Sequence, residues 1–204
     1  MASARPPSQP HGSAALPGDP WRNRGYLPHF DPSQALQAIT YRLADSLPAA
    51  VVERLDAECP DDEIERRRRI DAWLDAGHGA CILREPEHAA CVIDAWKHHH
   101  GQRYVLQAWV VMPNHVHVLI RMLGGASLAQ IVWSWKSWTA RRLGRGAWQR
   151  EYWDRYIRDE THYLSCVDYI HGNPVKAGLC RQPEDWPWSS ADPGSAALLR
   201  GRGQ

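Results

Sequence analysis

A pair of apolar strands around a turn is encoded in Trp109-Val-Val-Met-Pro-Asn-His-Val-His-Val-Leu-Ile120. Side chains alternate along a strand, so we expect His115 and His117 on one face and Val116 and Val118 on the other. Two imidazoles at adjacent positions of one face can chelate a metal ion. The same pair could instead be two satisfied histidines of a core, or a structural zinc site, although no cysteine lies at the spacing that such a site needs.

The segments on either side predict an α+β fold. Apolar residues recur with strand or helix periodicity in an order that alternates strands and helices. We expect strands at Ala38–Ala44, Arg103–Val111, His115–Arg121 and Glu151–Ile157, and helices at Asp61–Ala76, from Pro86 to Trp96, Ser127–Leu143 and Glu160–His171. This order predicts a ferredoxin-like (RRM-like) antiparallel sheet covered by helices.

The chain of 204 residues has the length of one domain with tails. Residues 1–24 are rich in Pro, Ser, Ala and Gly and predict a disordered leader, and residues 192–204 predict a flexible tail. The domain is therefore expected at 25–191, with a helical elaboration at 55–100.

Charge and cysteine content narrow the class of protein. The net charge is +1, but the segment from Trp133 to Arg158 carries seven basic and two acidic residues, which is a local positive field. Five cysteines without Cys-x-x-Cys spacing indicate neither a disulfide framework nor a cysteine zinc site. No signal peptide or membrane span is visible, so we expect a cytoplasmic protein with no membrane partner.

The last predicted helix carries a candidate nucleophile. Tyr169 and Asn173 are four residues apart and share one helical face. The opposite, core-facing stripe is expected to consist of Tyr163, Leu164, Val167 and Ile170. Gly172 and Pro174 mark the expected helix end, which makes the placement of Asn173 less regular. In the alternative interpretation, Tyr169 is a surface residue and Asn173 a helix cap.

An Asn amide oxygen beside His115 and His117 would give a mixed nitrogen and oxygen site. Such a donor set suits Mg²⁺ or Mn²⁺ acting as a Lewis acid on a phosphate oxygen. A phenol is a poor nucleophile at neutral pH and needs a polarised, well-aligned phosphodiester to attack.

The run from Gly146 to Arg158 interleaves aromatic and cationic residues, as single-strand DNA-binding surfaces do. With the preceding helix, it predicts the DNA-binding residues Lys136, Arg141, Arg142, Trp148, Arg150, Tyr152, Arg155 and Arg158. The alternative is a strand with a Trp/Tyr core face and a solvated Arg face. The runs Arg66–Arg69 and His98–His100 predict no function by themselves.

Several motifs in combination resemble the REP-associated tyrosine transposases, a single-tyrosine branch of the HUH (His-hydrophobic-His) nucleases. They are Trp109–Leu119, Trp135-Lys-Ser137, Trp148-Gln-Arg-Glu-Tyr-Trp-Asp154, Asp168-Tyr-Ile-His-Gly-Asn-Pro-Val-Lys-Ala-Gly-Leu179 and Pro183-Glu-Asp-Trp-Pro-Trp-Ser-Ser190. The resemblance extends from about Asn23 to Ser190.

The resemblance implies a metal-dependent transposase that cuts and joins single-stranded DNA. Tyr169 would attack the scissile phosphate to form a 5′-phosphotyrosine and a free 3′-hydroxyl, while His115, His117 and Asn173 would hold the cation. The substrates would be palindromic repeats that fold into hairpins, and the protein would act as a monomer or a homodimer. The alternative is a domesticated protein that binds DNA hairpins without cutting them.

Overall fold

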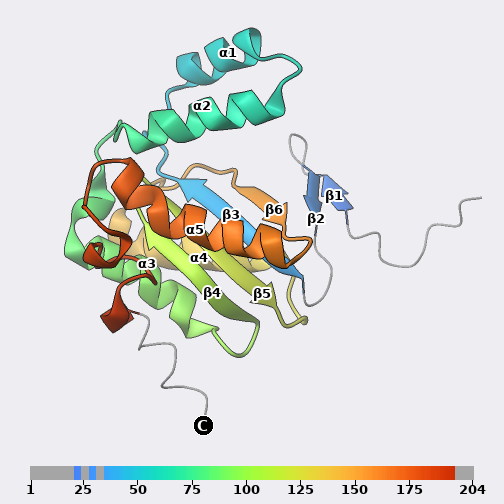
Figure 1. Cartoon of the computed structure of the whole chain (residues 1–204), viewed down its shortest axis with the longest axis vertical. Coiled ribbons are helices and arrows are strands. Elements are labelled where there is room, and N and C mark those ends of the chain that lie inside the picture. The colour runs from blue at the N-terminus through green and yellow to red at the C-terminus, as the bar shows by residue number, and fades with distance from the viewer. Residues whose placement is uncertain (1–20, 24–27, 31–34, 196–204) are drawn as a thin grey trace, which may run out of the picture.

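A four-stranded antiparallel sheet forms the centre of the protein in a computed structural model, which describes residues 21–23, 28–30 and 35–195 (Figure 1). Its strand order is β4-β5-β3-β6, with all neighbours antiparallel. The strands are β3 (Leu36–Arg42), β4 (Tyr104–Val111), β5 (His115–Met122) and β6 (Trp153–Tyr156). This is the strand order of a ferredoxin-like sheet, so the predicted fold class is confirmed.

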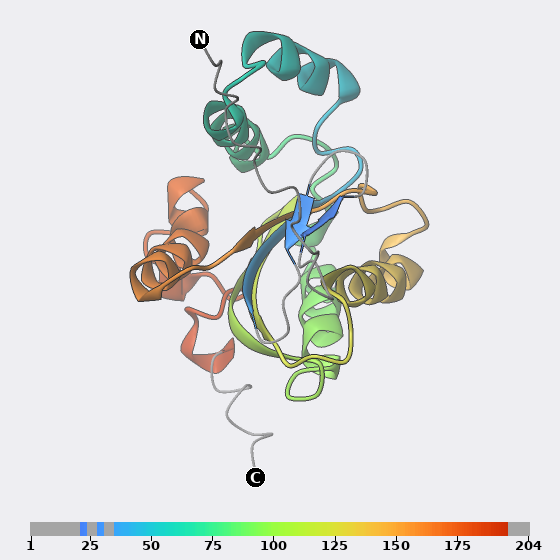
Figure 2. The same ribbon diagram turned by 90° about the vertical axis from the view of Figure 1, so that its right-hand side faces the viewer.

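Helices cover both faces of the sheet (Figure 2). One face packs on α3 (Pro86–His98) and α4 (Leu128–Leu143), and the other packs on α5 (Glu160–Lys176). A two-helix arm, formed by α1 (Ala49–Glu58) and α2 (Glu63–Asp75), lies at one end of these layers (Figure 1). Two 3₁₀ turns complete the fold, at Ile82–Arg84 and Pro183–Asp185.

The alternation of β5 assigns its side chains to two separate cores. Val116, Val118 and Ile120 belong to the core under α3 and α4. Leu119 belongs to the smaller core under α5, and His115 and His117 share its parity along the strand. The predicted separation of the histidines from the valines is therefore confirmed, and it turns the histidine pair towards α5.

Helix α5 is longer than its sequence predicts. It was expected to end near His171, but it continues to Lys176 with Pro174 inside it. Pro174 removes one backbone hydrogen bond, yet it is buried with Ile170 and Asn173, and this packing outweighs the loss. The expected core stripe is also wrong at Leu164, which is 55% exposed, whereas Tyr163 and Val167 do pack against the core.

The ends of the domain differ in detail from the prediction. Trp21–Asn23, placed in the leader, forms strand β1 and pairs with strand β2 (Pro28–Phe30). Ser195, placed in the tail, is buried and donates its hydroxyl to the carbonyl of Pro187. Residues 1–20 and 24 of the predicted leader and residues 196–204 of the predicted tail lie outside the described residues. Within the described part of the chain, no helix is both long enough and apolar enough to cross a bilayer.

Candidate active site

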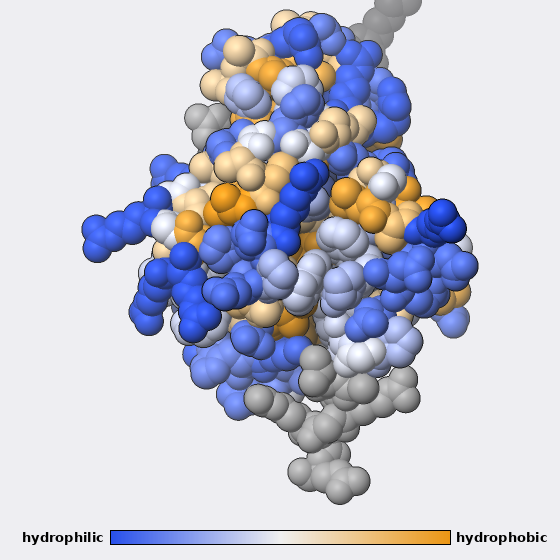
Figure 3. Space-filling model, turned by 90° about the vertical axis from the view of Figure 1, so that its left-hand side faces the viewer, coloured by the Kyte–Doolittle hydropathy of each residue, from blue (hydrophilic) through white to orange (hydrophobic). Residues whose placement is uncertain are grey.

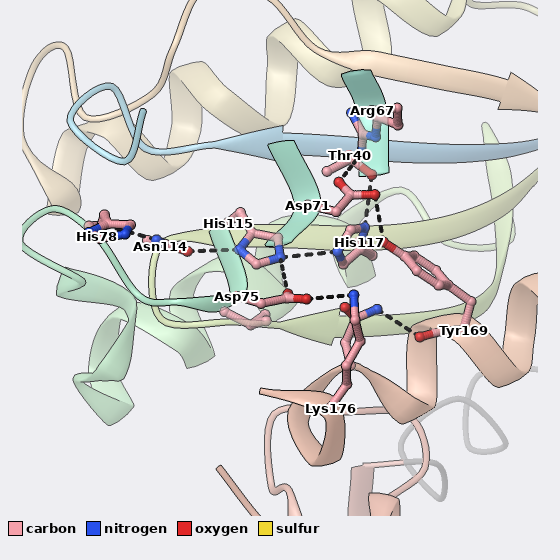
Figure 4. A network of polar contacts seen from close by, with 12 residues as sticks. Thr40, Arg67, Asp71, Asp75, His78, Asn114, His115, His117, Tyr169 and Lys176 are labelled. Carbon is pink, nitrogen blue, oxygen red and sulfur yellow. Dashed lines mark hydrogen bonds and ion pairs between the residues drawn. The ribbon is translucent and has the colours of Figure 1, made fainter. Parts of the chain in front are cut away.

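The two histidines of β5 point their Nε2 atoms at each other, 3.1 Å apart (Figure 4). The side-chain amide of Asn114 donates to the carbonyl of His78, which turns its Oδ1 towards His115 Nδ1 at 2.7 Å. His115 therefore carries its proton on Nδ1 and keeps a lone pair on Nε2. The hydroxyl of Thr40 lies 2.8 Å from His117 Nδ1 and can donate or accept a hydrogen bond there.

Burial keeps both imidazoles neutral. The exposed fraction is 1% for His115 and 3% for His117. Desolvation, followed by the nearby positive charges of Arg67 and Lys176, lowers the pKa of His115 to about 3, and burial likewise lowers the pKa of His117 well below its usual range. Neutral imidazoles whose Nδ1 atoms are held by hydrogen bonds are the form in which histidine binds metal ions.

Asn173 supplies a buried amide oxygen from α5. Its Nδ2 donates to the carbonyl of Tyr169 at 2.7 Å, while its Oδ1 has no hydrogen-bond partner among the described residues. A buried carbonyl oxygen without a partner is costly unless something outside the chain satisfies it. No three His, Cys, Asp or Glu side chains of the described residues are arranged to hold a metal, so a third protein ligand would need another donor, such as this amide.

Tyr169 lies beside the histidine pair. Its ring meets the His117 ring edge-on, with centroids 5.4 Å apart, and its hydroxyl donates to Asp71 Oδ2 at 3.0 Å. Partial burial, and then the negative charge of Asp71, raise the pKa of Tyr169 well above its usual value. The phenol is therefore protonated at neutral pH.

Helix α2 brings three charged residues to the site that the sequence did not reveal as functional. Arg67 pairs with Asp71 at 3.0 Å. Asp75, one turn further, lies 4.0 Å from His115 Nε2 and 2.7 Å from Lys176 Nζ of α5. Burial raises the pKa of Asp75, although Lys176 opposes this shift. The only sequence signal was the spacing of Asp71 and Asp75, which places them on one face of a predicted helix.

A cavity of about 410 Å³ lies between α2, α5 and the edge of the sheet, beside His117 and Tyr169. Its lining includes Arg67, Asp71, His117, Trp153 and Tyr169. On one side of the molecule, hydrophobic residues gather in a band below the two-helix arm, whereas hydrophilic residues dominate elsewhere (Figure 3). The cavity thus combines aromatic and apolar walls with charged groups beside Tyr169.

The predicted DNA-binding residues separate into two groups. Arg141, Arg142, Arg150, Arg155 and Arg158 are exposed. Trp148 and Tyr152 are buried in the core, where Trp148 donates to Thr139 at 2.8 Å, so neither ring is available to stack on a base. For these two residues the core-face alternative is the better interpretation.

Lys136, also predicted to bind DNA, makes contacts within the fold. Its ammonium donates to the carbonyls of Gln149, Arg150 and Glu151 at 3.0, 3.2 and 2.9 Å. Burial lowers its pKa to about 8. The aromatic residue of this segment that does reach the cavity is Trp153, whose ring lies 4.3 Å from the Arg67 guanidinium and 5.6 Å from that of Arg155.

Comparisons with known proteins give a consistent set of relatives. A family described as "Transposase IS200 like" matches residues 88–173. A REP-associated tyrosine transposase of Escherichia coli (strain K12) is 35% identical over 89 residues, which are 43% of this chain and 54% of that protein. A putative REP-associated tyrosine transposase of Haemophilus influenzae (strain ATCC 51907 / DSM 11121 / KW20 / Rd) is 47% identical over 45 residues, which are 22% of this chain and 26% of that protein.

The fold has a solved counterpart. The structure of a REP-associated tyrosine transposase bound to a REP hairpin matches with a TM-score of 0.57 at 21% identity, over 84% of this chain and 85% of that chain. Because the two chains are only 21% identical, this structural similarity is evidence for the fold alone. The matched segments span about half and about a quarter of the two relatives' own lengths. The family match ends at Asn173 and includes the histidine pair and Tyr169, but helix α2 lies outside it.

Proposed function

The chain belongs to the IS200-like tyrosine transposases, with REP-associated tyrosine transposases among its relatives, and on this premise we propose that it is a metal-dependent enzyme that cuts and joins single-stranded DNA. The expected family is thereby confirmed. The observation that carries the proposed activity is the meeting of His117 and Tyr169, which come from different elements and face one cavity.

The donor set fits a divalent cation. Burial keeps both imidazoles neutral, so at most one proton lies between their Nε2 atoms, 3.1 Å apart, and a divalent cation can take the place of that proton. The buried Oδ1 of Asn173, without a partner among the described residues, adds an oxygen donor. His115, His117 and Asn173 would therefore hold Mg²⁺ or Mn²⁺. When bound, such an ion acts as a Lewis acid on a phosphate oxygen.

In the proposed reaction, Tyr169 is the nucleophile. Its hydroxyl oxygen attacks the scissile phosphorus and forms a 5′-phosphotyrosine, and the leaving strand departs with a 3′-hydroxyl. The energy of the broken phosphodiester is kept in the new bond, so joining to another 3′-hydroxyl needs no nucleotide cofactor. Helix α5 orients the phenol because Ile170, its neighbour in sequence, is anchored in the core.

The proposed substrate is a hairpin formed by a palindromic repeat. A protein of the same fold is described as bound to a REP hairpin, which supports hairpin DNA as the partner here. Arg150, Arg155 and Arg158 are exposed on the segment that leads to the cavity and are suited to phosphate contacts. Trp153, at the cavity wall, offers an aromatic surface to a base of the cut strand.

The test is covalent capture of labelled hairpin DNA with a single-stranded flank, with Mn²⁺ or Mg²⁺ present. Wild type should form an adduct, and Tyr169→Phe should form none while it binds the hairpin with wild-type affinity. Tyr163→Phe is the matched control, because Tyr163 lies on the same helix, with its hydroxyl on Gln107. An adduct in Tyr169→Phe would refute the assignment of the nucleophile. Hairpin binding without any adduct in wild type would favour a binding protein that does not cut.

A further inference from the structure

The arginine run of α2 is divided by the fold into three surface residues and one active-site residue. Arg66 pairs with Asp56 and Glu63, and Arg68 and Arg69 both pair with Glu65. These contacts are within the two-helix arm.

Arg67 instead turns inward. It lies over the Trp153 ring at 4.3 Å and binds Asp71 Oδ1 at 3.0 Å. Trp153 pairs with Thr40 in the sheet register, and Thr40 in turn pairs with His117. Arg67 therefore packs on Trp153, which is connected across the sheet through Thr40 to His117, one of the candidate metal ligands.

This arrangement presents the second oxygen of Asp71 to the nucleophile. With Oδ1 on Arg67, Oδ2 accepts the hydrogen bond of Tyr169 at 3.0 Å (Figure 4). The side chain of Asp71 is 14% exposed and that of Arg67 is 19% exposed, so their ion pair is partly shielded from water, whereas Tyr169 is 40% exposed. Asp71 and Tyr169 are 98 residues apart in the sequence, and α2 lies outside the segment matched by the transposase family.

A protonated phenol must lose its proton as it forms a bond to phosphorus. A general base within hydrogen-bond reach contributes about 10²- to 10⁴-fold to such steps. The other groups near Tyr169 are engaged elsewhere: Asp75 pairs with Lys176, and the ring nitrogens of His117 contact Thr40 and His115. We propose that Asp71 is the general base that takes the proton of Tyr169, and that Arg67 is the positioning residue that holds it.

The assignment rests on the proposed function and completes its proton balance. As the bond between phosphorus and the Tyr169 oxygen forms, the phenol proton moves to Asp71 Oδ2. The bond from phosphorus to the 3′ oxygen breaks, and that oxygen keeps the electron pair and takes a proton from solvent. In the joining reaction, an incoming 3′-hydroxyl loses its proton to solvent and attacks the phosphotyrosine. Asp71 then returns the proton to the departing Tyr169 oxygen and acts as the general acid.

The experiment measures single-turnover cleavage and joining rates of the full chain on saturating hairpin DNA. Asp71→Asn keeps the shape of the side chain but cannot take a proton at neutral pH, and it should slow both directions by at least about 100-fold with unchanged hairpin affinity. Asp56→Asn is the matched control, because that carboxylate binds an arginine of the same helix without contacting Tyr169. The control should cleave at the wild-type rate.

A second measurement separates proton transfer from support of the fold. Replacing Tyr169 with a fluorinated tyrosine, whose phenol ionises at lower pH, should restore most of the rate lost in Asp71→Asn. Arg67→Ala should show a smaller loss with the same rescue, whereas a merely structural defect would not respond to fluorination.

The outcomes distinguish this assignment from the proposed function. Cleavage by Asp71→Asn within about threefold of wild type, faster cleavage, or a slow variant that fluorination does not rescue would each overturn the role of Asp71 alone. Absence of a Tyr169 adduct in wild type would overturn the proposed function and this assignment with it.

Discussion

Mild acid should destabilise the protein through its buried histidine pair. An imidazole that stays neutral in the folded state but takes up a proton in the unfolded state, with a pKa of about 6.5, favours unfolding as the pH falls below that value. The pKa of His115 is lowered to about 3, so its effect starts near pH 6.5 and continues down to about pH 3. Between pH 7 and pH 5, linkage predicts a loss of about 2 kcal/mol from this residue. His117, shifted in the same direction, should add a loss of similar size.

Urea unfolding at the two pH values measures this difference directly. In His115→Gln one titrating group is removed, so the loss between pH 7 and pH 5 should shrink by about 2 kcal/mol, whatever the absolute stability of the variant. His98→Gln is the control, because His98 is exposed on α3 and its removal should leave the acid dependence as in wild type. An unchanged acid dependence in His115→Gln would show that His115 is not held neutral, and would remove the argument that a neutral imidazole is available there to bind a cation.

Three further perturbations test the division between DNA contacts and core. Charge reversal at Arg150 or Arg155 should weaken hairpin binding and lower the slope of log K against log salt by about 0.7–0.9 per lost phosphate contact, whereas Arg54→Glu on the two-helix arm should leave the slope unchanged. Trp148→Ala should cost about 3–5 kcal/mol of unfolding free energy without altering the hairpin affinity of the folded protein, and a selective loss of affinity would refute its placement in the core. Gly172→Ala should raise the unfolding free energy by about 1 kcal/mol, because the glycine is helical and no atom lies within 4 Å of an added Cβ; a lower value would indicate a break in α5.

The elements of the fold could be predicted because their signals are local. The strand parity of β5 is contained in consecutive residues, and it placed His115 and His117 together without further information. The apolar periodicity of α4 likewise predicted its bounds to within one residue. The end of α5 could not be predicted in this way, because Gly172 and Pro174 are local stop signals, whereas the burial of Pro174 that overrides them comes from tertiary packing.

Burial also explains why the sequence could not separate stacking residues from core residues in the predicted DNA surface. Alternating aromatic and basic residues describe both a stacking surface and a strand with one core face, and the sequence does not distinguish them. Trp148 packs edge-on against Tyr41, with centroids 4.7 Å apart, and so belongs to the core. Trp153 has a similar local context but pairs with Thr40 on the α5 side of the sheet, so its ring reaches the cavity.

The contribution of α2 to the candidate site could not be predicted from the sequence for a related physical reason. Arg66, Arg68 and Arg69 form the solvated, ion-paired surface that an arginine-rich helix ordinarily has, and this is the structure that the composition predicts. Arg67 differs from them only in its neighbour, Trp153, which lies far along the chain on β6. Helical periodicity places Asp71 one turn from Arg67. Tyr169, however, contacts Asp71 only because α5 packs on the opposite side of the cavity. The histidine pair can therefore be inferred from one strand, whereas the Arg67, Asp71 and Tyr169 contact exists only once the two-helix arm has docked beside the sheet. For that reason, variants that loosen this arm should impair cleavage before they impair hairpin binding.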